Sequence, residues 1–117
     1  MSLDGLSILI PTHNYSVTTL VESLVNQSSK IDSKIEIIVY EDGSSLFLSE
    51  NASVENTANV TYIHGDENIG RAAARQFLAE KADFQWLLFV CSLFFCQAYQ
   101  IFYQVFRICL KPVQPIV

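Results

Sequence analysis

Short runs of apolar residues alternate along the chain with segments whose apolar positions recur every three or four residues. This apolar spacing predicts a helix over 17–27, and a composition rich in alanine and long side chains predicts a second helix over 69–82, with Asn68 at its N-cap. A loop with a weak helix is expected over 45–58. The apolar runs are too short for helices and predict four buried strands, at residues 6–10, 35–40, 60–64 and 85–90. The alternation indicates an α/β fold with a parallel sheet and right-handed crossovers.

Polar clusters follow the first three of these strands. Their sequences are PTHN at 11–14, EDGSS at 41–45 and GDENIGR at 65–71. The carboxyl ends of parallel strands meet at one edge of a sheet, and this edge is where ligands of α/β proteins bind. Taken alone, EDGSS is typical of a turn and PTHN of a helix entry, but three clusters at one edge predict a ligand site.

The residue types in these clusters favour a ligand that carries a diphosphate. Arg71 and Arg75 lie four residues apart near the start of a helix, so both guanidinium groups are on one face, beside an end that already attracts anions. The alternative is an exposed pair bonded to Glu67 or to water. Asp42 suits a base N–H or a ribose hydroxyl, and His13 suits stacking on a base. Both the glycine-rich fingerprint of dinucleotide sites and the Walker A loop are missing from the sequence.

In their order and spacing, SILIPTHNYS, LVESLVNQ, IEIIVYEDGSS, ENIGRAAARQ and WLLFV resemble the family 2 glycosyltransferases of GT-A fold, over roughly residues 5–90. The resemblance implies a sheet of strand order 3-2-1-4, a nucleotide-diphospho-sugar donor and glycosyl transfer with inversion. It makes residues 1–90 the donor-binding half of a GT-A domain, and NIGRAAARQ resembles versions from bacterial surface polysaccharide enzymes. By position, it assigns donor binding to Pro11, Thr12, His13, Asn14, Glu41, Asp42, Asn68, Gly70, Arg71 and Arg75.

One motif of this family is missing from the chain. The family places an Asp-x-Asp motif after the fourth strand, where it binds the Mg²⁺ or Mn²⁺ that bridges the donor diphosphate. Here Val90 is followed by Cys91 and Ser92, which do not replace hard anionic ligands, and no Asp or Glu occurs beyond Asp83. We therefore assign no metal ligand and no catalytic residue, and we expect this chain to bind a donor without transferring sugar at a useful rate. The alternative is a non-catalytic nucleotide-binding or interaction module with the same fold.

The composition changes near residue 86. All 12 acidic residues lie between Asp4 and Asp83, whereas residues 91–117 are apolar and aromatic with a thin polar stripe. Three interpretations fit this tail: an apolar helix over 97–110 packed on the sheet, a membrane segment, or a frameshifted or truncated gene product. The abrupt loss of acids at the family's metal motif favours the third as the origin of the tail and does not decide how the tail folds. Three glutamines and Arg107 argue against the membrane segment. An apolar tail of this kind also predicts self-association.

Charge and cysteine content narrow the class of protein further. The formal net charge of −5 argues against a nucleic-acid partner. The three cysteines fit no zinc spacing, and the first residues do not resemble a secretory signal, so we expect a location in the cytoplasm or at the inner face of the membrane. The glycosylation sequons at Asn51 and Asn59 are then chance matches.

Overall fold

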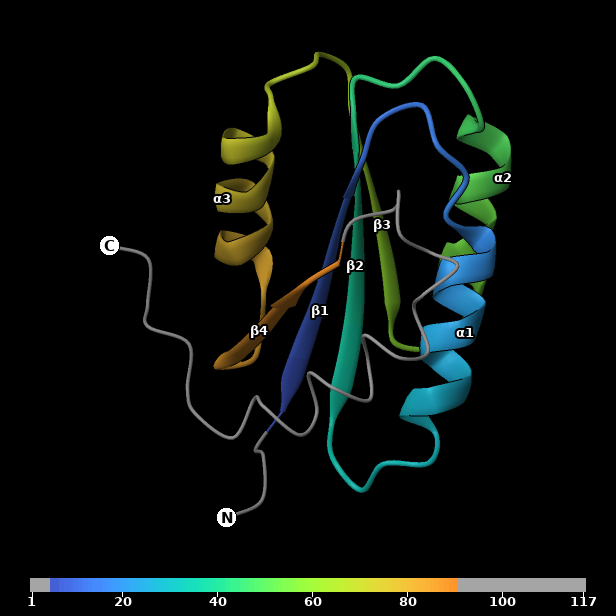
Figure 1. The fold of residues 1–117 in the computed structure, drawn as a ribbon, viewed down its shortest axis with the longest axis vertical. Coiled ribbons are helices and arrows are strands. Elements are labelled where there is room, and N and C mark those ends of the chain that lie inside the picture. The colour runs from blue at the N-terminus through green and yellow to red at the C-terminus, as the bar shows by residue number, and fades with distance from the viewer. Residues whose placement is uncertain (1–4, 91–117) are drawn as a thin grey trace.

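The computed structural model describes residues 5–90 of the chain. The interpretations of residues 91–117 given above lie outside the described residues. The described part is a parallel sheet with helices on both faces (Figure 1). Its elements are β1 (Leu6–Thr12), α1 (Thr18–Ser28), β2 (Ile35–Asp42), α2 (Leu48–Ala52), the 3₁₀ turn η1 (Ser53–Asn56), β3 (Val60–Gly65), α3 (Arg71–Lys81) and β4 (Trp86–Phe89).

The strand order is β3-β2-β1-β4 and every neighbouring pair is parallel, which confirms the predicted order. β1 lies between β2 and β4, with Ile8 opposite Ile37 on one side and Leu88 on the other. Because the strands are parallel, the loops that follow β1, β2 and β3 all lie at the same carboxyl edge of the sheet.

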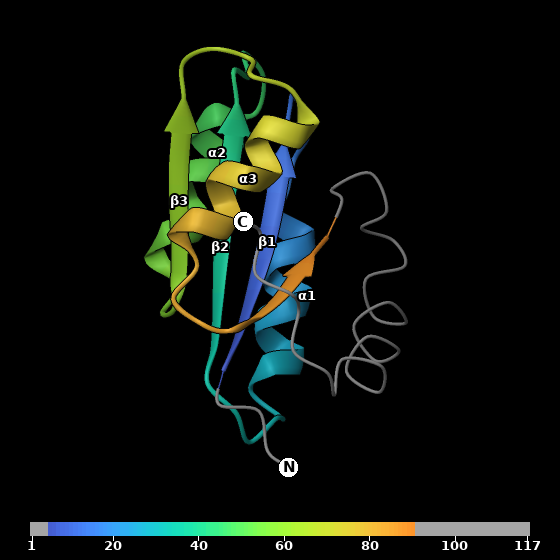
Figure 2. The ribbon, with the colours of Figure 1, turned by 90° about the vertical axis from the view of Figure 1, so that its left-hand side faces the viewer.

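Both faces of the sheet are covered, which explains why the strands read as continuous apolar runs. α1 and α2 lie on one face and α3 on the other (Figure 1), and Figure 2 views the sheet from the α3 side. Ile8 and Ile10 belong to the core cluster that also contains Leu20 and Leu24 of α1. Leu9 points the other way, into the cluster with Ala74 and Leu78 of α3. Side chains alternate between the two faces along a strand, so β1 contributes to the hydrophobic clusters on both faces of the sheet.

The ends of the elements differ from the sequence prediction in ways that matter for the site. β1 continues through Pro11 to Thr12, and β2 continues to Asp42, so Thr12 and Asp42 lie on strands rather than in loops. α3 begins at Arg71 with Gly70 as its N-cap, so the prediction that Asn68 caps this helix is wrong. No described helix is long and apolar enough to cross a membrane.

Candidate functional site

The loops after β1, β2 and β3 lie at the carboxyl edge of the sheet (Figure 1). A cavity of about 500 Å³ opens there. Eight of the ten residues assigned to donor binding line it, and the structure brings them together from three separate segments. Tyr15, Ala74, Phe89 and Val90 complete the lining and were not predicted. The predicted residues in the lining are Pro11, Thr12, His13, Asp42, Asn68, Gly70, Arg71 and Arg75.

Asp42 holds the start of α3 in place. Its side chain is only 5% exposed, and its Oδ1 accepts a hydrogen bond from the Ile69 N–H at 2.7 Å. Its Oδ2 accepts one from the Gly70 N–H at 3.1 Å. The backbone N–H groups that precede the helix are thus satisfied by a carboxylate from β2, which explains why Asn68 is not needed as a cap.

His13 is fixed in one orientation at the mouth of the cavity. Its Nδ1 lies 2.7 Å from the carbonyl oxygen of Asp42. A carbonyl oxygen can only accept, so Nδ1 carries the hydrogen. Its Nε2 lies 3.2 Å from Nδ2 of Asn14 and accepts from that amide. The Asn14 amide cannot turn over, because its Oδ1 already accepts from the N–H groups of Ser45 and Leu46. Contacts at both ring nitrogens therefore fix the orientation of the imidazole, and Nδ2 of Asn68 also lies 3.2 Å from its Nδ1.

Asn14 and Glu41 do not line the cavity, although the sequence assigned both to donor binding. Asn14 adopts a left-handed backbone with φ of 57° and bridges the loops after β1 and β2. Glu41 is fully buried, and its carboxylate accepts from Ser44 Oγ at 2.6 Å and from Tyr62 Oη at 3.1 Å. Ser44 Oγ in turn accepts from the Asn14 N–H at 2.9 Å. Glu41 thus stands behind the cavity and supports its loops.

The partnership with Glu41 also affects Tyr62. Burial raises the pKa of the Tyr62 hydroxyl well above its ordinary value, and the negative charge of Glu41 and their hydrogen bond raise it further. The hydroxyl therefore stays protonated and remains a donor to Glu41 over the ordinary pH range.

Asn51 is a supporting residue that the sequence reasoning did not assign to the site. It is fully buried in α2, and its Nδ2 donates to Glu41 Oε2 and to the Tyr15 carbonyl, each at 2.7 Å. Its Oδ1 accepts from the Val17 N–H at 2.9 Å, just before α1 begins. Its amide is fully occupied in the fold, which agrees with a chance match to the glycosylation sequon. No local signal marked this residue, because all its partners are distant in sequence.

Arg71 and Arg75 both line the cavity, as expected for two residues on one face of a helix. The Arg75 guanidinium carbon lies 5.5 Å from the ring centroid of Phe89, in cation–π contact with the last residue of β4. Among residues 5–90, the ion pair is between His64 and Asp66 at 3.5 Å, so neither arginine is paired with Glu67. The two guanidinium groups are available to an anion in the cavity.

The charges around the cavity favour an anionic ligand. Two guanidinium groups and the N-terminus of α3 face one described carboxylate, that of Asp42. That carboxylate already accepts two backbone hydrogen bonds. Forked guanidinium donors beside a helix start suit phosphate oxygens.

The residues present do not fit the divalent cation that the resemblance implies. No group of three or more His, Cys, Asp or Glu residues in the described part could hold a metal ion. Val90, the residue that follows β4, is buried, and the sequence beyond Asp83 contains no Asp, Glu or His. A hard cation needs several oxygen ligands, and the described lining of the cavity offers only the carboxylate of Asp42.

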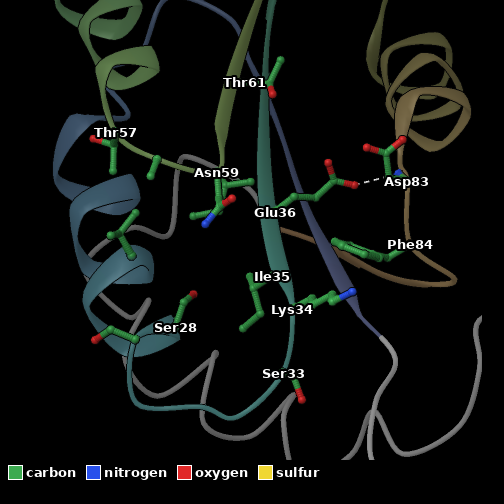
Figure 3. Close-up of a pocket in the computed structure, with 14 residues that line it drawn as sticks. Ser28, Ser33, Lys34, Ile35, Glu36, Thr57, Asn59, Thr61, Asp83 and Phe84 are labelled. Carbon is green, nitrogen blue, oxygen red and sulfur yellow. Dashed lines mark hydrogen bonds between the residues drawn. The ribbon is translucent and has the colours of Figure 1, made fainter.

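A second cavity, of about 640 Å³, lies at the opposite, amino edge of the sheet (Figure 3). This cavity is larger than the first, but the carboxylate of Glu36 in its lining already accepts hydrogen bonds, from the Asp83 N–H at 2.7 Å and from the Ser7 hydroxyl. The hydroxyls of Ser28 and Ser29 donate hydrogen bonds to backbone carbonyls of α1. None of the three polar clusters reaches this cavity, so we place the functional site at the carboxyl edge.

Four large apolar side chains are exposed in the described part, and all of them lie in the loops at the carboxyl edge: Tyr15, Leu46, Phe47 and Ile69. Of these four, Tyr15 lines the cavity. Self-association of the chain stays a prediction.

Comparison with known proteins gives a consistent result. The sequence profile of the family described as Glycosyl transferase family 2 matches residues 7–90. An uncharacterized glycosyltransferase of Haemophilus influenzae is 36% identical over 89 residues, which cover 73% of this chain and 28% of that protein. The chain therefore spans little more than a quarter of this relative.

Solved structures show the same fold. The crystal structure of S. aureus TarS 1-349 aligns with a TM-score of 0.58 and 24% identity, covering 75% of this chain and 27% of that one. The mannosyltransferase PcManGT from Pyrobaculum calidifontis, in complex with GDP-Man and Mn²⁺, aligns with a TM-score of 0.59 and 18% identity, covering 74% and 27%. TarS 1-349 is also known in complex with UDP-GlcNAc, with a TM-score of 0.58 and 22% identity, covering 75% and 26%.

Proposed function

The chain belongs to glycosyl transferase family 2, and on this premise we propose that its carboxyl-edge cavity binds the nucleoside diphosphate part of a nucleotide sugar. The observation that carries the proposal is the convergence of Arg71, Arg75, Asp42 and His13 on one cavity from three segments of the chain. The diphosphate lies beside the start of α3 and the two arginines. The nucleoside lies toward His13 and Asp42, which offer a fixed aromatic ring and a carboxylate.

The class of ligand has support from the structural neighbours. PcManGT binds GDP-Man, and TarS 1-349 binds UDP and UDP-GlcNAc. These ligands share a nucleoside diphosphate and differ in base and sugar. The proposal for this chain is limited to the shared part, because the site residues identified here address a diphosphate and a base or ribose without selecting a sugar.

We further propose that this chain binds the donor without transferring its sugar at a useful rate. Inverting transfer needs a base for the acceptor and stabilisation of the leaving diphosphate. The sequence beyond Asp83 supplies no carboxylate for either task, and the chain spans about a quarter of its relatives. A role in surface polysaccharide synthesis and a cytoplasmic or membrane-face location stay predictions from the sequence.

Calorimetry with the full chain tests the binding proposal. UDP and GDP are titrated separately in the presence of Mn²⁺, and we expect saturable binding of at least one. Arg71→Gln removes a cavity guanidinium and should weaken binding about tenfold or more, since hydrogen bonds to charged groups contribute about 1.5–3 kcal/mol. Lys30→Gln removes a positive charge at the exposed end of α1 and should bind like the wild type. Absence of saturation with both nucleotides contradicts the proposal.

A second assay addresses transfer. The purified chain is incubated with UDP-GlcNAc or GDP-mannose and Mn²⁺, and release of nucleoside diphosphate is followed. We expect release at the background rate. Each 1.36 kcal/mol by which the activation free energy is higher lowers the rate about tenfold. Mn²⁺-dependent release well above background would show that the chain is catalytic by itself.

A further inference from the structure

We infer that this chain binds a nucleoside diphosphate without any divalent cation, and that Arg71 and Arg75 supply the positive charge. The inference rests on the proposed function, because it concerns the same cavity and the same ligand. It follows from the charges and contacts of the described residues and from the acids that the sequence does not contain.

The first step is the donor set. The two acids at the end of β2 are already committed: Glu41 is fully buried with three hydrogen-bond donors around it, and both oxygens of Asp42 hold backbone N–H groups. Asp66 pairs with His64 and is 92% exposed. These carboxylates do not converge on one point of the cavity, so they offer no cage for a hard cation.

The second step is the charge balance. A pair of carboxylates beside a diphosphate repels it until a divalent cation neutralises them, which makes binding depend on the metal. This chain has no such pair after β4, so neither the repulsion nor the cation that relieves it is present. What faces the ligand is one hydrogen-bonded carboxylate and two guanidinium groups. The charges of the described lining therefore attract a diphosphate even without a metal ion.

The third step is the position of Arg75. Its guanidinium lies against Phe89, the last residue of β4, with 5.5 Å between the guanidinium carbon and the ring centroid. The cation is thus held at the end of the fourth strand, where family members carry their metal motif. Stacking on a ring leaves the N–H donors at the edge of the guanidinium free for phosphate oxygens. Arg71 is one helical turn earlier, on the same face.

The chain contains a matched control for this arrangement. Lys81 belongs to the same helix and also stacks on a phenylalanine, with its Nζ 5.4 Å from the ring centroid of Phe77. It lies at the other end of α3 and does not line the cavity. Arg75→Gln and Lys81→Gln therefore remove the same charge and the same type of contact, and only the first removes it from the proposed site.

The experiment titrates the full chain with UDP and with GDP, once in Mn²⁺ and once in EDTA. We expect the same dissociation constant in both buffers, within about twofold. Arg75→Gln should weaken binding about tenfold or more in either buffer, while Lys81→Gln should bind like the wild type. Circular dichroism of both variants checks that the fold is kept.

Each outcome has a distinct meaning. Binding in Mn²⁺ that is lost in EDTA overturns the inference and leaves the proposed function standing. No binding in either buffer overturns the proposed function itself. Equal affinities of Arg75→Gln and Lys81→Gln overturn the assignment of the charge to Arg75. Metal-independent binding that Arg75→Gln weakens and Lys81→Gln does not is the result that supports the inference.

Discussion

The carboxylate of Asp42 accepts a hydrogen bond from the backbone N–H of Gly70 at 3.1 Å, so the start of helix α3 is held by an acid at the end of strand β2. This contact ties β2 to the loop that carries Arg71 into the cavity. It gives Asp42 a structural role in the site in addition to any contact with a nucleoside. The position of the two arginines therefore depends on a residue that precedes them by about 30 positions.

Replacing Asp42 should disturb both stability and binding. Asp42→Ala leaves the N–H groups of Ile69 and Gly70 without their acceptor, which should cost about 1–3 kcal/mol of unfolding free energy in urea titrations. Nucleotide affinity should fall by a similar amount, because the start of α3 moves. The control Asp66→Ala, at a 92% exposed side chain, should change stability by no more than about 0.5 kcal/mol. Equal effects of the two variants would contradict the role of Asp42.

Gly43 should tolerate a side chain less well than Gly70. Both have positive φ, 66° at Gly43 and 91° at Gly70. A Cβ at Gly43 would overlap the backbone nitrogen of Asn68, whereas a Cβ at Gly70 meets nothing within 4 Å. Gly43→Ala therefore carries backbone strain and a backbone clash, and Gly70→Ala carries strain alone. Urea unfolding should show a larger loss for Gly43→Ala. The reverse order would mean that the two loops are not packed as described.

A carboxylate at position 51 should make stability depend on pH. The Asn51 amide donates to Glu41 at 2.7 Å, so Asn51→Asp places two acids in contact in a buried site. Each raises the pKa of the other. The pair is tolerated when one member is protonated, so the loss of stability should be largest near pH 7 and should shrink as the pH falls toward about 4.

The control for this experiment is Asn26→Asp, at an exposed position on α1, which should show no such recovery in acid. The measurement is the urea midpoint of both variants and the wild type across this pH range. Parallel pH profiles for Asn51→Asp and Asn26→Asp would argue that the amide at 51 does not contact Glu41.

Tyr62 should contribute to alkaline unfolding. Its pKa is raised by burial and by Glu41, so its stabilising contribution is complete below the ordinary tyrosine value of about 10 and is lost as the pH rises through the folded-state pKa. Tyr62→Phe should be less stable than the wild type near neutral pH, because Glu41 loses a donor. The difference between the two should narrow above about pH 10. Tyr15→Phe, at an exposed side chain, should follow the wild-type pH profile.

Much of the fold could be predicted from the sequence because its signals are local. Apolar runs of strand length and the apolar stripe of 17–27 depend on neighbouring residues, and the strand order followed once the family resemblance was recognised. The continuation of β1 past Pro11 was missed. β4 pairs with β1 only as far as Leu9, so the proline lies beyond the double-sided part of the sheet, where a missing N–H is tolerated.

The cavity lining was predictable only in part, because many of its contacts join residues that are distant in the sequence. The clusters at the carboxyl edge supplied the polar residues, since topology alone places them together. Asn68 was expected to cap α3 because it stands at the right spacing, but the acceptor comes from Asp42, 27 residues before Ile69. Asn51 binds partners 10, 34 and 36 residues away, and Phe89 stacks on Arg75 across α3 and β4. Contacts of this range leave no local pattern.

The most direct test of the central claim is to map where a nucleoside diphosphate binds. Backbone amide spectra of the ¹⁵N-labelled chain are recorded while UDP or GDP is added. The account predicts shifts at the start of α3 and around Asp42, at Ile69, Gly70 and Arg71, with no change around the amino-edge cavity at Thr57, Asn59 and Thr61. Shifts confined to the amino-edge cavity would contradict it.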